Sequence, residues 1–266
     1  MARSWRGPIP AAGLTPSGGS AARGLYALSR LMRALVPAVG TLLLGFAAAH
    51  GLAPLLPLPR QLPSGERARL EEIAKNSFAS TRVEHEPYAA QPEVWEYLLD
   101  HPEFATHVTR ALKLARYRIW QDASGLWLED GWGVKGQFAF VHAERGVRVM
   151  YARGQFEQRL LPEIRGQAVA TLEYAFRRDG GGHTVVATAA SGYVQVDNRV
   201  LNTLGKVAAP IVQARADKEA GYLLRTFARV TRAIEEDPAR VYQLVSERSD
   251  VPHHELEEFR RLLRLP

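Results

Sequence analysis

The spacing of apolar residues between residues 78 and 114 predicts one strand followed by two helices. Residues 81–85 alternate between side chains suited to opposite faces of a half-buried strand. Pro92 then stands where the first turn of a helix tolerates proline, and Val94, Trp95 and Leu98 follow at helical spacing. Residues 103–114 place Phe104 and further apolar side chains on one side of a second helix. A shorter amphipathic helix is expected upstream, over residues 66–75.

The next stretch changes to a period of two, which predicts an antiparallel sheet. Runs of β character, separated by turns that contain glycine, cover residues 117–122, 126–130, 136–142, 147–156, 167–177 and 183–196. In the fifth run Leu172, Tyr174 and Phe176 share one face, so that face should be dry and the other wet. Trp132, Phe138 and Phe140 likewise share one parity. We expect an antiparallel meander with an aromatic interior.

The period changes again after residue 198, and the new spacing predicts a long helix. Apolar residues recur every three or four positions over residues 201–237, with a possible break at Pro210. The tail, residues 238–266, predicts one or two short charged helices whose apolar side contains Leu256, Phe259, Leu262 and Leu263. The main domain should therefore span residues 66–237 and belong to the α+β class.

An uncharged apolar run near the N-terminus predicts export or membrane anchoring. No Lys, Arg, Asp or Glu occurs over residues 34–59, and Arg23, Arg30 and Arg33 precede the run. Residues 1–31 read as a disordered or untranslated extension, with Met32 as the working start. Residues 32–49 read as a signal peptide cleaved after Ala49, or as a retained anchor, and the proline-rich residues 50–65 as a spacer. An organelle transit peptide is the alternative. We expect a periplasmic or exported domain, or one anchored outside the cytoplasm.

Charge and composition narrow the possible partners and chemistry. Residues 1–65 hold six arginines and no acid, which leaves 28 basic and 28 acidic residues in the remainder of the chain. A formally neutral body does not supply the basic stripe that phosphate backbones require, so no nucleic acid is expected. The chain has no cysteine, and none of its eight histidines forms a His-x-x-x-His pair, so neither a disulfide scaffold nor a metal site is predicted.

The motif search returns one literal match, at Gly131-Trp132-Gly133-Val134-Lys135-Gly136. This is the G-x-G-x-x-G spacing of dinucleotide sites, but a β-like run follows it where such a site needs a helix. We interpret the glycines as a tight bend or bulge in a curved sheet. No Gly-x-Ser-x-Gly elbow and no Walker-type loop occurs, and no cofactor is predicted.

The order of elements resembles the START-like, or helix-grip, superfamily of lipid-transfer and polyketide-cyclase domains. In that comparison, residues 100–108 (DHPEFATHV) correspond to the helix-pair segment, and residues 201–230 correspond to the gripping helix. The resemblance covers about residues 78–237. It implies a curved antiparallel sheet wrapped around the long C-terminal helix, with an apolar cavity between them. The helical tail and the preceding signal or anchor segment depart from the usual pattern.

The leading hypothesis is an exported, non-catalytic domain that binds or transfers an apolar small molecule such as a lipid, with a membrane surface as a possible partner. Arg215, spaced i,i+4 from Glu219, could orient a polar head group or simply form a surface pair. The apolar candidates are either pocket lining or plain core. The predicted ligand-binding residues are Trp132, Phe138, Phe140, Tyr151, Leu172, Tyr174, Phe176, Tyr193, Leu204, Ile211 and Arg215.

Two alternatives remain open from the sequence. The first is an enzyme of the cyclase or hydrolase kind on the same fold, with Glu129, Asp130, Tyr151 or Tyr193 acting in the cavity. The second is an interaction protein with a filled core and an exposed apolar side on its C-terminal tail. Acids that project into solvent would count against the enzyme. A C-terminal tail whose apolar side is covered would count against the interaction protein.

Overall fold

The computed structural model describes residues 56–266 apart from 132, 159–160 and 198–208, and a few further side chains at the borders of these gaps. The helices are α2 (Ser64–Lys75), α3 (Pro92–Asp100), α4 (Pro102–Ala111), α6 (Ala209–Glu236), α7 (Pro238–Ser246) and α8 (His253–Leu262). The strands are β1 (Ala79–Ala89), β2 (Arg118–Asp122), β3 (Gly125–Glu129), β4 (Val134–Glu144), β5 (Val147–Gln158), β6 (Leu161–Arg178) and β7 (Thr184–Val196). Among the described residues, no helix combines the length and apolar character needed to cross a bilayer. The predicted signal, and part of the spacer, lie outside the described residues.

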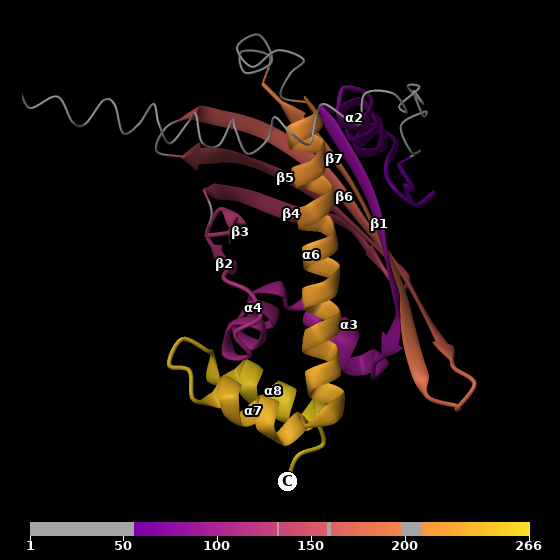
Figure 1. Cartoon of the computed structure of the whole chain (residues 1–266), viewed down its shortest axis with the longest axis vertical. Helices are drawn as coiled ribbons and strands as arrows, with labels where there is room; N and C mark the ends of the chain where they lie inside the picture. Colours follow the sequence, from indigo (N-terminus) through magenta and orange to yellow (C-terminus); the bar gives the residue numbers. More distant parts are fainter. Residues whose placement is uncertain (1–55, 132, 159–160, 198–208) are drawn as a thin grey trace, which may run out of the picture. The chain divides into compact units, whose positions relative to one another are not determined.

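The seven strands form one antiparallel sheet in the order β1-β7-β6-β5-β4-β3-β2. Strands β2 to β7 follow one another as a meander, and β1 closes the far edge by pairing with β7. The α+β class, the antiparallel sheet and the long C-terminal helix predicted from the sequence are confirmed. Figure 1 shows α6 crossing in front of the curved sheet, which is the helix-grip arrangement.

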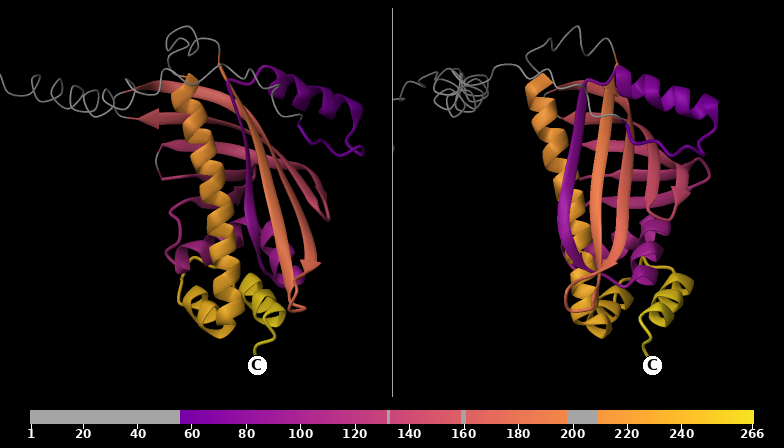
Figure 2. Two further views of the ribbon diagram at one scale, coloured as in Figure 1. Left: turned by 45° about the vertical axis from the view of Figure 1, so that its right-hand side comes forward. Right: turned by 90° about the vertical axis from the view of Figure 1, so that its right-hand side faces the viewer.

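A row of three glycines marks the bend of the sheet. Gly136, Gly154 and Gly166 stand directly opposite one another on β4, β5 and β6. A Cβ at Gly136 would lie 2.6 Å from the carbonyl oxygen of Arg153, and one at Gly166 would lie 2.5 Å from that of Gln195. Only glycine allows the neighbouring backbones to come so close. The crease turns the sheet toward α6, and Figure 2 shows the middle strands running in a clearly different direction from β1 and β7 within the one sheet.

Helix α6 lies along the inner side of β1 and is attached to it at both ends. The side chain of Gln213 accepts a hydrogen bond from the Ser80 backbone N–H (3.1 Å) and donates one to the Ser80 carbonyl. The backbone N–H of Gln91, just beyond β1, donates to the carboxylate of Glu235 (2.8 Å). The helix therefore satisfies free polar groups near the edge strand and also blocks pairing with another chain.

Trp95 of α3 closes the lower half of the interior. Its ring is 1% exposed and lies 4.5 Å from the ring of Tyr174 and 5.3 Å from that of Phe227. Its indole N–H donates to the hydroxyl of Tyr88 (3.1 Å), so its one polar atom is satisfied. This end of the space between sheet and helix is a filled core.

The outer face of the sheet is covered by α2. Leu70 and Ile73 of α2 pack against Val149 and Val169, and Leu62, from the predicted spacer, is also buried there. Figure 2 shows α2 on the side of the sheet away from α6. The chain is thus folded against the sheet from at least residue 56 onward.

The C-terminal tail is part of the core. Phe259 of α8 is fully buried, and its ring contacts that of Phe104 in α4 at 5.1 Å. Val241 and Val245 of α7 belong to the same cluster, and Leu263 is 8% exposed. The apolar side predicted for the tail thus packs against α3, α4 and the end of α6. The hypothesis of a docking tail required this side to be exposed, and the structure shows it covered.

Replacing Phe259 with alanine should lower the free energy of unfolding by about 3–5 kcal/mol, because the change leaves a cavity among aromatic and branched side chains. The exposed Arg261, two residues further on, provides the control, since its replacement with alanine should change stability by less than about 0.5 kcal/mol. Urea denaturation followed by circular dichroism measures both. Equal stability of the two variants would show that the tail is not part of the core.

Candidate functional site

Above the Trp95 cluster, the inner face of the sheet is apolar but incompletely covered. Register places Leu126 opposite Phe138, and Phe140 opposite Met150, all on the face that looks toward α6. These side chains are half-buried, whereas Val149 and Val169 on the outer face are fully buried. The half-buried apolar residues of the inner face include Leu126, Leu128, Phe138, Phe140, Met150, Leu172 and Phe176.

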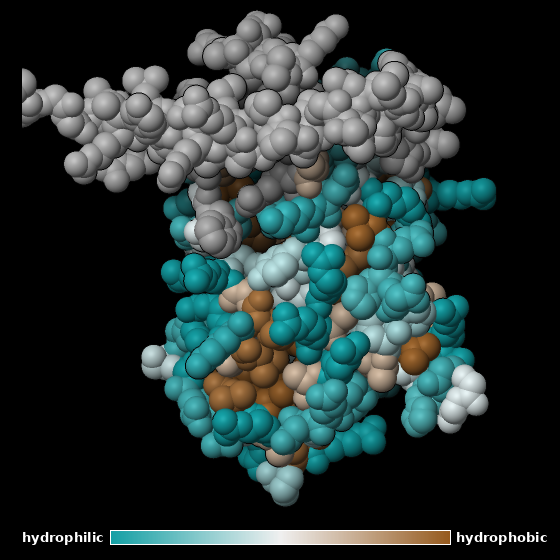
Figure 3. Space-filling view, viewed as in Figure 1, coloured by the Kyte–Doolittle hydropathy of each residue, from teal (hydrophilic) through white to brown (hydrophobic). Residues whose placement is uncertain are grey.

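Helix α6 presents apolar side chains to the same space. Leu223 is 46% exposed and lies one turn before Phe227, which contacts Trp95, so it projects along the same side of the helix. Val134 of β4 lies on the same face of the sheet as Phe138 and is 38% exposed. Figure 3 shows apolar surface beside α6 at the level of α4 and α7, below the strands. Exposed apolar surface of this kind is typical of a binding site.

The structure brings together five of the predicted ligand-binding residues. Phe138, Phe140, Leu172, Tyr174 and Phe176 share the inner face. Tyr174 is buried within the Trp95 cluster, and the other four are half-buried.

Two predicted residues lie on the opposite face of the sheet. Tyr151 pairs with Val169, and Tyr193 pairs with the same residue from the other side, so both tyrosines share the face covered by α2. Tyr193 is 1% exposed. Tyr151 lines an outer groove of about 690 Å³ together with Trp127 and Arg153. Neither tyrosine reaches the space under α6, because successive residues of a strand point to opposite faces.

The remaining predicted residues are not described in full. Trp132 and Leu204 lie outside the described residues. Ile211 and Arg215 belong to α6, but their side chains are outside the described part, and so is the predicted pairing of Arg215 with Glu219.

Of the acids considered for an enzyme, Glu129 lies on the outer face and Asp130 is held in a turn. Glu129 is exposed at the outer-face parity of β3, opposite Lys135. Asp130 accepts a hydrogen bond from the Val134 backbone N–H (3.0 Å), which stabilises the turn between β3 and β4. Gly133 in that turn has φ +112°, and a Cβ there would collide with the Glu157 carbonyl. The glycine motif therefore forms a tight turn followed by a strand, as interpreted.

A polar cluster that the sequence analysis missed joins α3 to the sheet. Arg148 is 6% exposed and donates to Asp100 (2.9 Å) and to the hydroxyl of Tyr174 (3.1 Å). Tyr174 in turn donates to Glu96 (3.2 Å). Burial raises the pKa of Tyr174, so its hydroxyl stays protonated as a donor. Arg148 has the parity of Met150, and the pairing of Met150 with Phe140 places that parity on the inner face, which the sequence alone could not show.

A cationic cleft lies beside the apolar space, where the C-terminus of α4 meets α6 and the loop after α7. The cleft has a volume of about 620 Å³, and Arg110, Lys113, Arg116 and Arg248 line it together with Leu114 and Tyr222. Periodicity could not have predicted this cleft, since it assembles from three segments that are far apart in the sequence. No Asp or Glu is among the described residues that line it.

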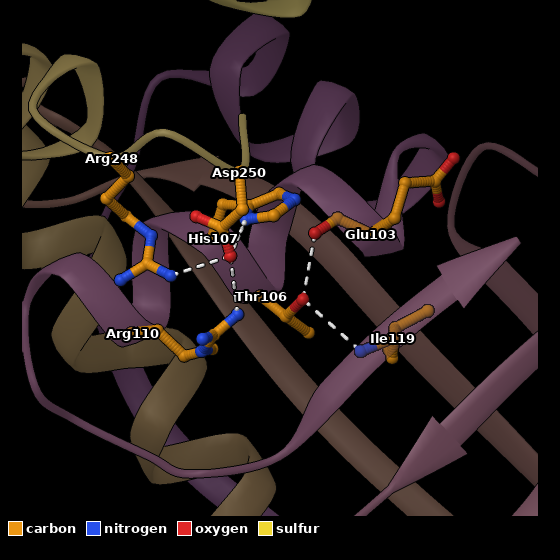
Figure 4. Close-up of polar contacts among 7 residues, drawn as sticks. All are labelled: Glu103, Thr106, His107, Arg110, Ile119, Arg248 and Asp250. Atoms are coloured by element: carbon orange, nitrogen blue, oxygen red, sulfur yellow. Dashed lines mark hydrogen bonds and ion pairs between the residues drawn. The ribbon is translucent and has the colours of Figure 1, made fainter. Parts of the chain in front are cut away.

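An ion-pair cluster fixes one wall of the cleft (Figure 4). Asp250 accepts hydrogen bonds from Arg110 (3.0 Å) and Arg248 (2.8 Å), and His107 lies 3.6 Å from the same carboxylate. Burial opposes ionisation of Asp250, but the hydrogen bond and charge of Arg248, with the charges of His107 and Arg110, outweigh it and lower its pKa. Thr106 donates to the Glu103 carbonyl and accepts from the Ile119 N–H, which joins α4 to β2.

In the described part of the chain, no group of three or more His, Asp or Glu side chains could hold a metal ion.

The fold defines an α+β protein with a long helix against the concave face of an antiparallel sheet. No family model matches the chain, and no curated protein matches it. Among solved structures, the crystal structure of hypothetical protein jhp0584 from Helicobacter pylori is similar at 10% identity and a TM-score of 0.34, over 58% of this chain and 86% of that one. Norcoclaurine synthase from Thalictrum flavum is similar at 15% identity and a TM-score of 0.37, over 66% and 96%. Scores this low carry no functional inference.

The titration of His107 tests the geometry of the ion-pair cluster. Burial lowers the pKa of His107 from its usual value of about 6.5, Asp250 partly raises it, and Arg248 lowers it. The stability that comes from neutral His107 is therefore complete above pH 6.5 and is lost as the pH falls toward the folded-state pKa. Asp250→Asn should lower the pKa of His107 further, as read by NMR of the imidazole. Glu236→Gln, on the exposed side of α6, should leave it unchanged.

A pKa above 6.5 in the unaltered protein, or one that Asp250→Asn does not move, would contradict the arrangement in Figure 4.

Proposed function

We propose that this domain binds an apolar small molecule, with lipids as the leading candidates, between the inner face of the sheet and α6. The observation that carries the proposal is the incomplete cover of that face. Its apolar side chains stay half-buried, and Leu223 of α6 is exposed beside them, while Val149 and Val169 on the outer face are fully buried under α2. Apolar surface that stays in contact with water does not stabilise the folded domain, but a ligand that covers this surface gains binding affinity.

Burial of hydrocarbon supplies the driving force. Each methylene group removed from water contributes about 0.8 kcal/mol, before the cost of association and of ordering a flexible chain. The Trp95 cluster closes the lower end of the space, so a ligand would enter from the part of the face between α6 and strands β2 to β4. The filled lower core gives rigidity, and the open part gives room for the ligand.

A role in binding or transfer is favoured over catalysis. The carboxylates of Glu129 and Asp130 are held at an outer face and in a turn, and Tyr151 and Tyr193 belong to the outer face. General acid–base work requires a group within hydrogen-bond reach of the bound substrate. Glu129, Tyr151 and Tyr193 point away from a ligand under α6, and the carboxylate of Asp130 is engaged by the backbone of its turn.

We further propose that the domain works outside the cytoplasm, as an exported protein or one held at a membrane. The support is the sequence of residues 23–59, in which arginines precede an uncharged apolar run and tend to stay on the cytoplasmic side. N-terminal sequencing of protein from fractionated cells tests this. A chain that begins at His50, or one retained in the membrane fraction, is expected, and an intact Met1 on cytoplasmic protein would contradict it.

Replacing Leu223 with glutamine should weaken the binding of a fluorescent fatty acid by about three- to tenfold, because the variant removes part of an apolar wall. The change should leave stability nearly unaltered, since the side chain is already exposed and glutamine is a good helix former. Arg229→Gln provides the matched control, since it lies on the exposed outer side of α6. Fluorescence titration gives both affinities, and thermal unfolding confirms that both variants are folded.

Native mass spectrometry of protein purified from the cells that naturally produce it is a second test of ligand binding. The proposal predicts an adduct that organic extraction removes. An unliganded mass, together with no uptake of any fluorescent fatty acid or sterol, would refute it.

A further inference from the structure

We propose that the cationic cleft formed by Arg110, Lys113, Arg116 and Arg248 binds an anionic head group, so that the ligand is an amphiphile carrying a carboxylate or a phosphate. This inference rests on the proposed function, and it narrows the ligand from any apolar small molecule to one with an anionic head group. An apolar face alone would accept sterols and alcohols equally, whereas a charged cleft at its edge selects for an acid.

The charge of the cleft supports an anion. Four cationic side chains line it, and two of them, Arg110 and Arg248, share the carboxylate of Asp250. Each of these guanidinium groups has five N–H donors, so both keep donors for a ligand after bonding Asp250. Arg110 and Arg248 share the one carboxylate of Asp250, and Lys113 forms no ion pair among the described residues, so these three side chains give the cleft an excess of positive charge within a body that is neutral overall.

The end of α4 holds Lys113 at this cleft. The helix ends in a Schellman motif, in which the Lys113 N–H donates to the Arg110 carbonyl and the Leu114 N–H donates to the Thr109 carbonyl, both at 3.0 Å. Lys113 takes the left-handed position of that motif, with φ +56°, which glycine normally occupies. Its side chain is exposed, and in the described part of the chain it forms no ion pair. A free cation is therefore fixed at the cleft by its backbone.

The cleft and the apolar space meet at α6. Tyr222 lines the cleft and donates from its hydroxyl to the Leu114 carbonyl (2.8 Å). The next residue, Leu223, is exposed on the side of α6 that faces the sheet. One turn of α6 thus borders the charged and the apolar surface, and the apolar patch beside α6 in Figure 3 lies at the level of α4 and α7. A molecule whose chain lies against the inner face can reach the cations with its head group.

The test compares ligands that share one chain and differ in charge. Isothermal titration calorimetry with dodecanoate, dodecyl phosphate, dodecanol and inorganic phosphate separates the contribution of the head group from that of the chain. The unaltered protein should bind both anionic amphiphiles about tenfold or more tightly than dodecanol, because hydrogen bonds to charged groups contribute more than neutral ones. The preference should shrink as salt is added.

Lys113→Gly removes the cation and places the residue best suited to the left-handed backbone, so the variant should be at least as stable as the original. It should lose about tenfold in affinity for dodecanoate and nothing for dodecanol. Arg264→Gly is the matched control, because Arg264 occupies the same position at the end of α8, with φ +54°, and does not line the cleft. It should bind every ligand as the unaltered protein does.

The outcomes distinguish this inference from the function it rests on. Equal affinity for dodecanol and dodecanoate, or a preference that Lys113→Gly leaves unchanged, would overturn the head-group assignment and leave apolar binding intact. Inorganic phosphate binding as tightly as dodecyl phosphate would also overturn it, because the cleft would then be an anion site independent of the apolar face. Failure of every amphiphile to bind would overturn the proposed function and this inference together.

Discussion

The close approach of β4, β5 and β6 at Gly136, Gly154 and Gly166 is the constraint on which the architecture depends. Any side chain there would strike the backbone of the next strand, so these three aligned positions permit the crease that turns the sheet toward α6. A creased sheet has two unlike faces. On the outer face, the short helix α2 buries Val149 and Val169, whereas on the inner face apolar side chains stay half-buried beside α6.

The rest of the fold determines which part of the inner face stays open. Trp95 and the tail helices fill the lower end, and the bonds from Gln213 and Glu235 hold α6 along β1 at the edge of the sheet. The surface left uncovered is therefore the part on β3 to β5, next to the end of α4. The same geometry that leaves it open places four cations at its border, and this combination is the basis of the proposal of an acidic amphiphile.

The spacing of apolar residues was sufficient to predict the helices, the strands and the class of the fold, because each helix or strand places its apolar residues on one face. It was not sufficient for the site. Tyr151 and Tyr193 could be assigned to a face only once the register between strands was known, since a shift of one residue exchanges the two faces. The same holds for Arg148, which lies in β5 at the parity opposite to Tyr151. The cleft depends on contacts among residues 110–116, 222 and 248, which no local pattern encodes.

The location of the bound chain tests the account most directly. Val149 and Met150 are neighbours in β5 that point to opposite faces, Val149 buried under α2 and Met150 half-buried toward α6. With methyl-labelled protein and unlabelled dodecanoate, the account predicts intermolecular nuclear Overhauser effects from the ligand chain to the methyl of Met150 and none to the methyls of Val149. Contacts to Val149, or a bound chain that contacts neither residue, would contradict binding at the inner face.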